Sequence, residues 1–246
     1  TANILEADAN EIQNDYGNNA TNGGAIYLAG GNLTIGESSK IIGNYATEGG
    51  ALYVSGGTAN ILANKPTTTD SSDSSKIPVG NIIANFAGNG GAVAITGGEL
   101  NVGRFGDEEG NKKPGYICNN YALNGGAIYG KGNNAKINLT FGGIYNNRVL
   151  RKMNNNIYEH GQGGGVYTSE NVVLNVNNFT IQGNYAYEGG GLYLNNNATT
   201  TIKACNSADA ETTKICENTA IKNGGGIYVN SSSSKLDFGG ACIFNN

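Results

Sequence analysis

Few residues in this chain have the chemical type and the spacing that catalysis requires. Hydrolysis of a glycosidic bond needs two closely placed carboxylates, and a structural zinc site needs a cluster of cysteine and histidine side chains. The single histidine stands in the tripeptide Glu159-His160-Gly161, which has the form of a hydrolase fragment but lies in an insertion without paired aspartates. No Cys-x-x-Cys or histidine-containing metal pattern occurs in the sequence. We therefore expect no enzymatic activity, no metal ion and no cofactor.

A recurring tyrosine is the strongest candidate for a binding function. A glycine pair followed by a small residue and an aliphatic residue occurs seven times, and six copies continue with a tyrosine: Tyr27, Tyr53, Tyr129, Tyr167, Tyr193 and Tyr228. Exposed tyrosine faces flanked by Asn and Thr offer stacking and hydrogen bonds to a sugar. Aromatic side chains on adjacent strands also stabilise a sheet by about 0.2–1 kcal/mol per pair without binding anything. Both interpretations stay open at this stage.

The glycine pairs also mark a structural repeat. They begin at Gly23, Gly49, Gly90, Gly125, Gly163, Gly189 and Gly224, at intervals of 26 to 41 residues, as expected for solenoid coils with insertions. An aliphatic residue precedes the tyrosine position in every copy: Ile26, Leu52, Val93, Ile128, Val166, Leu192 and Ile227. Side chains alternate between the two faces of a strand, so these aliphatic residues point inward and the tyrosines form an outer column, interrupted at Ala94.

Two further short segments complete each repeat. A β-branched, alternating segment follows the glycine strand, as in Asn32–Ile35 and Glu99–Val102. The phrase Ile-x-x-Asn supplies a third segment, with its asparagine at Asn44, Asn85, Asn120, Asn147, Asn184 and Asn218. Three short strands per turn predict an all-β, right-handed parallel β-helix of about seven three-stranded coils with loop insertions, stacked about 4.8 Å apart.

The repeated asparagines are expected to form a ladder. Each side chain can donate to and accept from the asparagines of the coils above and below, which satisfies backbone groups at a bend. Forty glycines and only three prolines fit many tight turns. A small alanine, as in Ala46 and Ala87, follows soon after the asparagine in most copies and fits a crowded inner corner.

The four cysteines leave a disulfide open. Cys205 and Cys216 enclose a short insertion and could be bridged in an oxidising compartment, with Cys242 as a competing partner for Cys216. Alternatively, Cys118 and Cys216 occupy the same position of the repeat and serve as small apolar residues.

Composition and charge limit the kinds of partner that the protein is expected to bind. The net charge of −4 is small, and Lys and Arg do not interleave with aromatic residues, so we expect no nucleic-acid binding. No apolar run is long enough to cross a membrane, and the unbroken repeat predicts one β-helix domain over residues 1–246. Charged or polar insertions at 64–78, 104–114 and 148–162 are candidate recognition loops, although solvated loops of this kind are common.

The two ends of the sequence fall within coils. Residues 1–5 repeat the phrase found at residues 58–62, and residues 243–246 match the third segment without a following glycine pair. We therefore expect either a segment of a longer repeat array or head-to-tail association of copies, because uncapped solenoid ends present unpaired strand edges.

The paired motifs resemble the repeats of the polymorphic outer-membrane proteins of chlamydiae. Gly23-Gly24-Ala25-Ile26 and Gly125-Gly126-Ala127-Ile128 have the form GGA[ILV], and the upstream Ile-x-x-Asn stands where that family has Phe-x-x-Asn. The last three copies depart further, with three consecutive glycines. The resemblance implies a surface-exposed β-helix of the kind that forms the passenger of an autotransporter adhesin, and similar repeats occur in surface proteins of other bacteria and of some protists.

Three functions follow as alternatives. The first is a non-enzymatic, adhesin-like protein at the cell surface or outside the cell, presenting its loops and tyrosine column to a host or matrix glycan or protein. The second is a structural stalk or self-associating fibre subunit. The third is a polysaccharide lyase or hydrolase, since pectate lyases and polygalacturonases are also β-helices, but the strand positions here are Asn, Gly, Thr and Tyr, with acidic residues mostly in loops.

Overall fold

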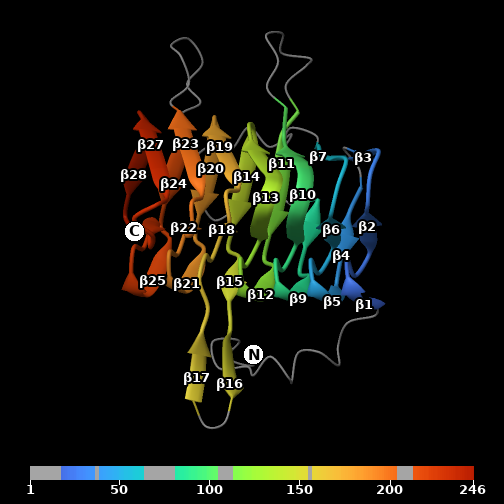
Figure 1. Ribbon diagram of the computed structural model, residues 1–246, viewed down its shortest axis with the longest axis horizontal. Coiled ribbons are helices and arrows are strands. Elements are labelled where there is room, and N and C mark those ends of the chain that lie inside the picture. Colours follow the sequence, from blue (N-terminus) through green and yellow to red (C-terminus); the bar gives the residue numbers. More distant parts are fainter. Residues whose placement is uncertain (1–17, 37–38, 64–80, 105–112, 155–156, 204–212) are drawn as a thin grey trace, which may run out of the picture.

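The chain folds as a parallel β-helix, which confirms the predicted fold class. The computed structural model describes residues 18–36, 39–63, 81–104, 113–154, 157–203 and 213–246, and all the regular secondary structure in these ranges is β. Successive coils lie side by side along the long axis of the molecule (Figure 1). Their strands form parallel sheets of 7, 12 and 7 strands, and a separate antiparallel hairpin completes the structure. No helix that could cross a membrane occurs in the described ranges.

The first sheet is formed by the segments that begin at or just after the repeated asparagine. Its strands are β1 (Asn18–Asn22), β5 (Asn44–Glu48), β9 (Phe86–Asn89), β12 (Tyr121–Asn124), β15 (Arg148–Val149), β21 (Tyr185–Glu188) and β25 (Thr219–Asn223). This sheet stands where the sequence predicted only an inner corner. Its inward residue is a fully buried alanine in most coils, for example Ala46 and Ala122, and an alanine alone gives too weak an alternation to indicate a strand.

The second sheet holds both the glycine strand and the segment after it. The glycine strands are β2 (Ile26–Leu28), β6 (Leu52–Val54), β10 (Val93–Val102), β13 (Ile128–Leu139), β18 (Val166–Ser169), β22 (Leu192–Leu194) and β26 (Ile227–Val229). The following segments are β3 (Asn32–Ile35), β7 (Thr58–Ile61), β19 (Val173–Asn177), β23 (Thr199–Lys203) and β27 (Lys235–Gly239). In β10 and β13 the two segments form one continuous strand. Each coil contributes strands to three sheets, but the predicted first and second strands belong to the same sheet.

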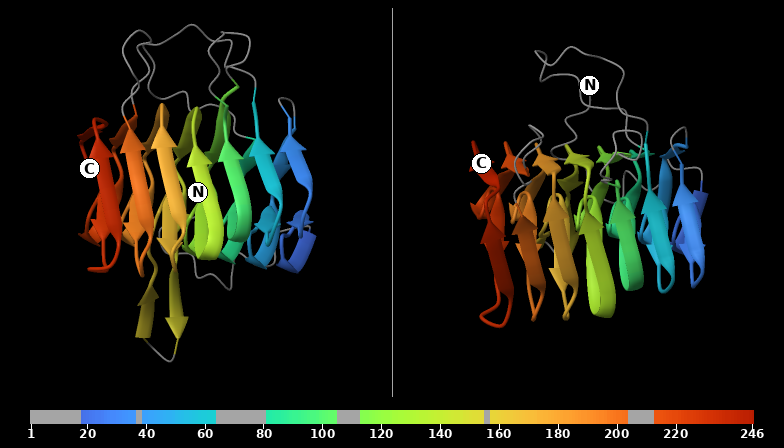
Figure 2. Two further views of the ribbon diagram at one scale, coloured as in Figure 1. Left: turned by 45° about the horizontal axis from the view of Figure 1, so that its top comes forward. Right: turned by 90° about the horizontal axis from the view of Figure 1, so that it is seen from above.

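The third sheet carries the Ile-x-x-Asn phrase. Its strands are β4 (Ile41–Ile42), β8 (Ile82–Ile83), β11 (Gly115–Cys118), β14 (Gly142–Tyr145), β20 (Phe179–Gln182), β24 (Lys214–Cys216) and β28 (Cys242–Phe244). The three sheets enclose one narrow core, and Figure 2 shows the coils from two further directions.

The predicted inward row is confirmed. Ile26, Leu52, Val93, Ile128, Val166, Leu192 and Ile227 are register partners from one coil to the next. The five inner members of this row are fully buried, and the two end members are partly buried. A continuous apolar row of this kind is what holds stacked coils together, because each coil buries its aliphatic side chains only against its neighbours.

The insertion at 148–162 forms the hairpin. β16 (Arg151–Asn154) and β17 (Ile157–His160) pair antiparallel, with Arg151 opposite His160. The hairpin projects beyond the wall of the solenoid (Figures 1 and 2). The insertions expected at 64–78 and 104–114 lie almost entirely outside the described residues.

Candidate functional site

The tyrosine column lies on the outer face of the second sheet. Tyr27, Tyr53, Ala94, Tyr129, Tyr167, Tyr193 and Tyr228 are register partners in consecutive coils. Strand alternation places them opposite the buried aliphatic row, so they form a single file along the molecule. Ala94 interrupts the file and is fully buried.

Three pairs of neighbouring rings in this column stack, whereas Tyr193 and Tyr228 are tilted by 57°. Ring centroids lie 5.3 Å apart for Tyr27 and Tyr53, 4.9 Å apart for Tyr129 and Tyr167, and 5.2 Å apart for Tyr167 and Tyr193, with interplanar angles of 10 to 14°. Neighbouring rings therefore cover each other's flat faces. The open faces that sugar stacking requires are thus confined to the ends of each stack, as at Tyr27, which is 52% exposed.

Ring edges and hydroxyl groups are what the column presents elsewhere. The Tyr53 hydroxyl lies 3.1 Å from Oγ1 of Thr96, and Oγ of Ser55 donates to the Tyr27 hydroxyl at 3.1 Å. These contacts join a tyrosine to a hydroxyl residue of the next coil and fix the outward direction of the ring. The column can therefore act as a row of regularly spaced hydrogen-bonding groups.

Burial changes the acidity of two of these tyrosines. Desolvation raises the pKa of Tyr193 to about 12, and desolvation together with the neighbouring Tyr167 raises the pKa of Tyr129 well above its usual value of 10. A neutral phenol is therefore favoured in the folded protein.

This shift predicts a loss of stability in alkali. In the unfolded chain a tyrosine releases its proton near pH 10, whereas Tyr193 keeps it to about pH 12. The unfolded state thus binds fewer protons between these values, and the free energy of unfolding falls as pH rises from 10 to 12. Tyr193→Phe is expected to make this fall shallower in urea denaturation at a series of pH values. An unchanged slope would contradict the burial of this hydroxyl.

The repeated asparagines stand between the third and first sheets and form a continuous hydrogen-bonded ladder. Nδ2 of each donates to Oδ1 of the next at 2.8 to 3.1 Å, through Asn18, Asn44, Asn85, Asn120, Asn147, Asn184, Asn218 and Asn246. Four of them, Asn85, Asn120, Asn147 and Asn184, are fully buried. Nδ2 of Asn120 also donates to the carbonyl oxygens of Ile82 and Cys118. This ladder stabilises the corner and leaves little capacity for a ligand.

A second asparagine row was not identified as a candidate from the sequence. Asn60, Asn101, Asn138 and Asn175 lie on the outer face of the second sheet, and Nδ2 of each of the last three donates to Oδ1 of the preceding asparagine at 2.8 to 3.1 Å. The signal was present as an asparagine between two inward aliphatic residues in four coils, such as Leu100-Asn101-Val102. Polar residues at outward positions are so common that the pattern alone does not indicate a site.

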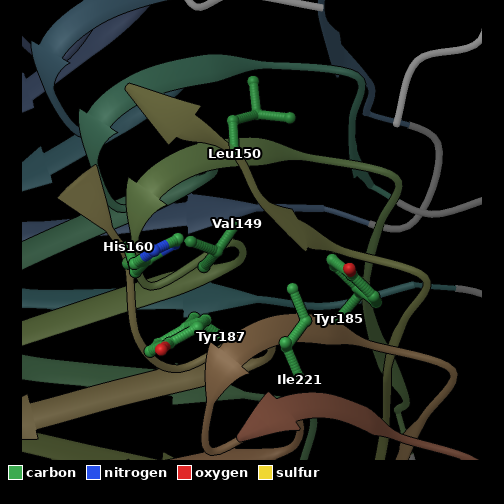
Figure 3. A pocket seen from close by; sticks show the side chains of 7 residues that line it. Val149, Leu150, His160, Tyr185, Tyr187 and Ile221 are labelled. Carbon is green, nitrogen blue, oxygen red and sulfur yellow. The ribbon is translucent and has the colours of Figure 1, made fainter. Parts of the chain in front are cut away.

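His160 packs against an aromatic residue of the solenoid wall. Its ring centroid lies 3.9 Å from that of Tyr187, with the rings nearly parallel, and Val149 and Ile221 lie beside them in a small pocket (Figure 3). Lys222 lies over the Tyr187 ring at 5.8 Å. No carboxylate is among the described residues that line this pocket, and the side chain of Glu159 lies outside the description. The histidine thus serves to attach the base of the hairpin to the wall.

Among the described cysteines, Cys118 and Cys216 are buried and Cys242 is exposed, and no two of them are joined by a disulfide. Cys205 lies outside the described residues, so the Cys205–Cys216 disulfide stays a prediction. Cys216 is the register partner of Phe244, and Cys242 is the partner of Lys214, so Cys216 and Cys242 are displaced by two residues. Burial raises the pKa of the Cys216 thiol, which disfavours the reactive thiolate. Among the described residues, no three His, Cys, Asp or Glu side chains come together as a potential metal site.

Fold and surface together define a parallel β-helix repeat protein with aromatic and amide rows on one outer face. Residues 114–131 match the Chlamydia polymorphic membrane protein repeat, which confirms the resemblance for this segment. The segment runs from β11 through β12 into β13 and contains both motifs, Ile117-Cys118-Asn119-Asn120 and Gly125-Gly126-Ala127-Ile128. Neither a curated protein nor a solved structure matches the chain.

Proposed function

We propose that this protein is a non-enzymatic β-helix of the cell surface or extracellular space that binds a host or matrix glycan or protein, as an adhesin does. The observation that carries the proposal is the tyrosine column, because a tyrosine stands on the same outer face in six of the seven coils. The match of one coil to a membrane-protein repeat supports the surface location. Tyrosine suits such a face because it adds apolar contact and a polar tip at a low entropic cost.

A structural stalk or fibre subunit is the second candidate. Seven glycine strands stack in register along one axis, as the coils of rod-like solenoid proteins do.

Tyrosine-to-phenylalanine substitution tests the proposed binding. The double variant Tyr129→Phe, Tyr167→Phe removes two hydroxyl groups and keeps the stacked rings. Binding to a glycan array, to immobilised collagen, fibronectin and laminin, and to epithelial cells is expected to weaken by about ten-fold, because each hydrogen bond contributes about 0.5–1.5 kcal/mol. Tyr145→Phe is the matched control, since that tyrosine lies on the third sheet.

Two results would contradict the proposal. One is a wild-type protein that binds none of these surfaces. The other is binding that persists unchanged in both double variants, Tyr129→Phe with Tyr167→Phe and Tyr129→Ala with Tyr167→Ala. If the wild type instead increases in mass with concentration in light scattering, the fibre is favoured.

A further inference from the structure

A groove of about 300 Å³ follows the outer asparagine row of the second sheet. One wall is formed by Asn101, Asn138, Asn175 and Thr201, from four consecutive coils. The other wall includes Thr140, Asn177 and Lys203. The strands that carry these residues, β10, β13, β19 and β23, lie side by side along the molecule (Figure 1). The groove therefore runs parallel to the solenoid axis, with a polar residue from four coils along the first wall and from three coils along the second.

The amides of this groove keep hydrogen-bonding capacity that the buried ladder lacks. An asparagine amide has two N–H donors and an oxygen with two lone pairs. Among the described residues, Nδ2 of Asn101 donates only to Asn60, and Nδ2 of Asn175 donates only to Asn138. Asn101 and Asn175 thus each have one N–H that donates to no described residue. Nδ2 of Asn138, in contrast, donates both hydrogens, to Glu99 and to Asn101.

Threonine side chains add further hydrogen-bonding groups to the walls. The hydroxyl groups of Thr140 and Thr201 lie along the same walls and can both donate and accept.

One end of the groove carries a positive charge. Lys203 is exposed and forms no ion pair with any described residue, whereas Lys136 on the same sheet is paired with Glu99 at 3.2 Å. Asp237 follows Thr201 in the next coil but forms no ion pair with Lys203 within the described structure. Among the described residues, no carboxylate therefore has to be displaced for an anionic group of a ligand to reach Lys203.

The strands beneath the groove have no free backbone edge. β13 pairs with β10 on one side and with β19 on the other, and β19 in turn pairs with β23. A peptide cannot join the sheet at this place, so a ligand must be recognised through side chains alone.

We propose that this groove binds an extended oligosaccharide that carries a carboxylate, with the chain along the solenoid axis and the carboxylate at Lys203. Sugar hydroxyls both donate and accept, which suits a row of half-used amides and threonine hydroxyls. Coils about 4.8 Å apart present a polar side chain at each step, and the two half-used amides, Asn101 and Asn175, stand two coils apart. The inference rests on the proposed surface-binding function and assigns a second site, with different residues from the tyrosine column.

Titration calorimetry with defined hexamers tests the inference. The probes are hexagalacturonate, hexamannuronate and the hyaluronan hexasaccharide as acidic chains, with cellohexaose and chitohexaose as neutral chains. We expect at least one acidic hexamer to bind, and Lys203→Gln to weaken that binding by about ten-fold or more, because hydrogen bonds to charged groups are the stronger ones. Lys136→Gln is the matched control, since this lysine is already paired, and it is expected to leave binding unchanged.

A second pair of variants tests the amides. Asn101→Ala with Asn175→Ala is expected to weaken the same binding by about ten-fold, because two side-chain hydrogen bonds are lost. Circular dichroism and urea denaturation show whether these variants keep the fold. Failure of every acidic hexamer to bind at millimolar concentration would overturn the inference, as would equal binding by wild type and Lys203→Gln. Phenylalanine variants of the tyrosine column are expected to leave groove binding intact, so failure at one site is distinguishable from failure at the other.

Discussion

Replacement of Asn120 by alanine is expected to lower the free energy of unfolding by about 4 kcal/mol, because several buried polar groups lose their partner at once. Oδ1 of Asn120 accepts from the backbone N–H of Asn85 at 2.9 Å and from its Nδ2 at 3.0 Å. Nδ2 of Asn120 donates to the carbonyl oxygens of Ile82 and Cys118 and to Oδ1 of Asn147. All of these groups lie at a dry corner, and an alanine methyl group satisfies none of them.

The measurement is urea denaturation followed by circular dichroism. The matched control is Asn101→Ala in the outer row, where water can replace the lost partner, and its expected cost is below about 1 kcal/mol. Asn120→Asp keeps the shape and the acceptor but places a carboxylate beside the two carbonyl oxygens, so it is expected to destabilise at neutral pH as much as alanine does. Equal costs for Asn120→Ala and Asn101→Ala would contradict the importance of the buried ladder.

The parts of this fold that were predictable from the sequence are those with a regular period. The aliphatic row from Ile26 to Ile227 alternates with outward tyrosines in every coil except that of Ala94, and only one register buries all of it. The Ile-x-x-Asn phrase likewise repeats an inward aliphatic residue and a corner asparagine, as at Ile117 and Asn120. A weak local preference becomes a clear signal when it recurs in every coil, because stacked coils must place equivalent residues at equivalent positions.

The first sheet was missed because its inward position is small. In β5 and β21 a single alanine faces the core between polar or aromatic neighbours, so the segment has no apolar alternation. Its strand conformation is imposed by pairing with the coils on either side rather than by its own residues. Tertiary pairing of this kind overrides local propensity.

The properties of the tyrosine column and of the outer asparagine row depend on distances that no sequence pattern contains. The tyrosine file was predictable, but the covering of ring faces follows from the 4.9 to 5.3 Å separation of stacked rings. The contact of His160 with Tyr187 depends on how the hairpin returns to the wall. The outer asparagines became candidates only when their hydrogen bonds distinguished half-used amides from fully bonded ones.

Replacement of Gly91 by alanine is expected to destabilise the protein by about 3 kcal/mol or more, because the added methyl group has no room in the packed corner. An ideal Cβ on Gly91 would lie 2.6 Å from the carbonyl oxygen of Tyr121 and closer still to that of Gly126. Both obstacles are backbone atoms of the next coil, so a side-chain rotation cannot relieve the clash. The backbone N–H of Gly91 donates to the carbonyl oxygen of Gly125 at 3.1 Å, and a shift of the coil would weaken this bond.

Gly30→Ala is the matched control for this prediction, since a Cβ at that position would meet no atom within 4 Å. Alanine at this position reduces the conformational freedom of the unfolded chain without a clash in the folded one. The free energy of unfolding is therefore expected to stay unchanged or to rise by about 0.5 kcal/mol. Both variants are compared with wild type by urea denaturation. The second glycine of every pair except the last lies under a backbone carbonyl of the next coil in the same way, as at Gly50 and Gly126, so the glycine pair sets how closely coils can stack. A cost for Gly91→Ala below about 1 kcal/mol would show instead that the corner can open to admit a methyl group.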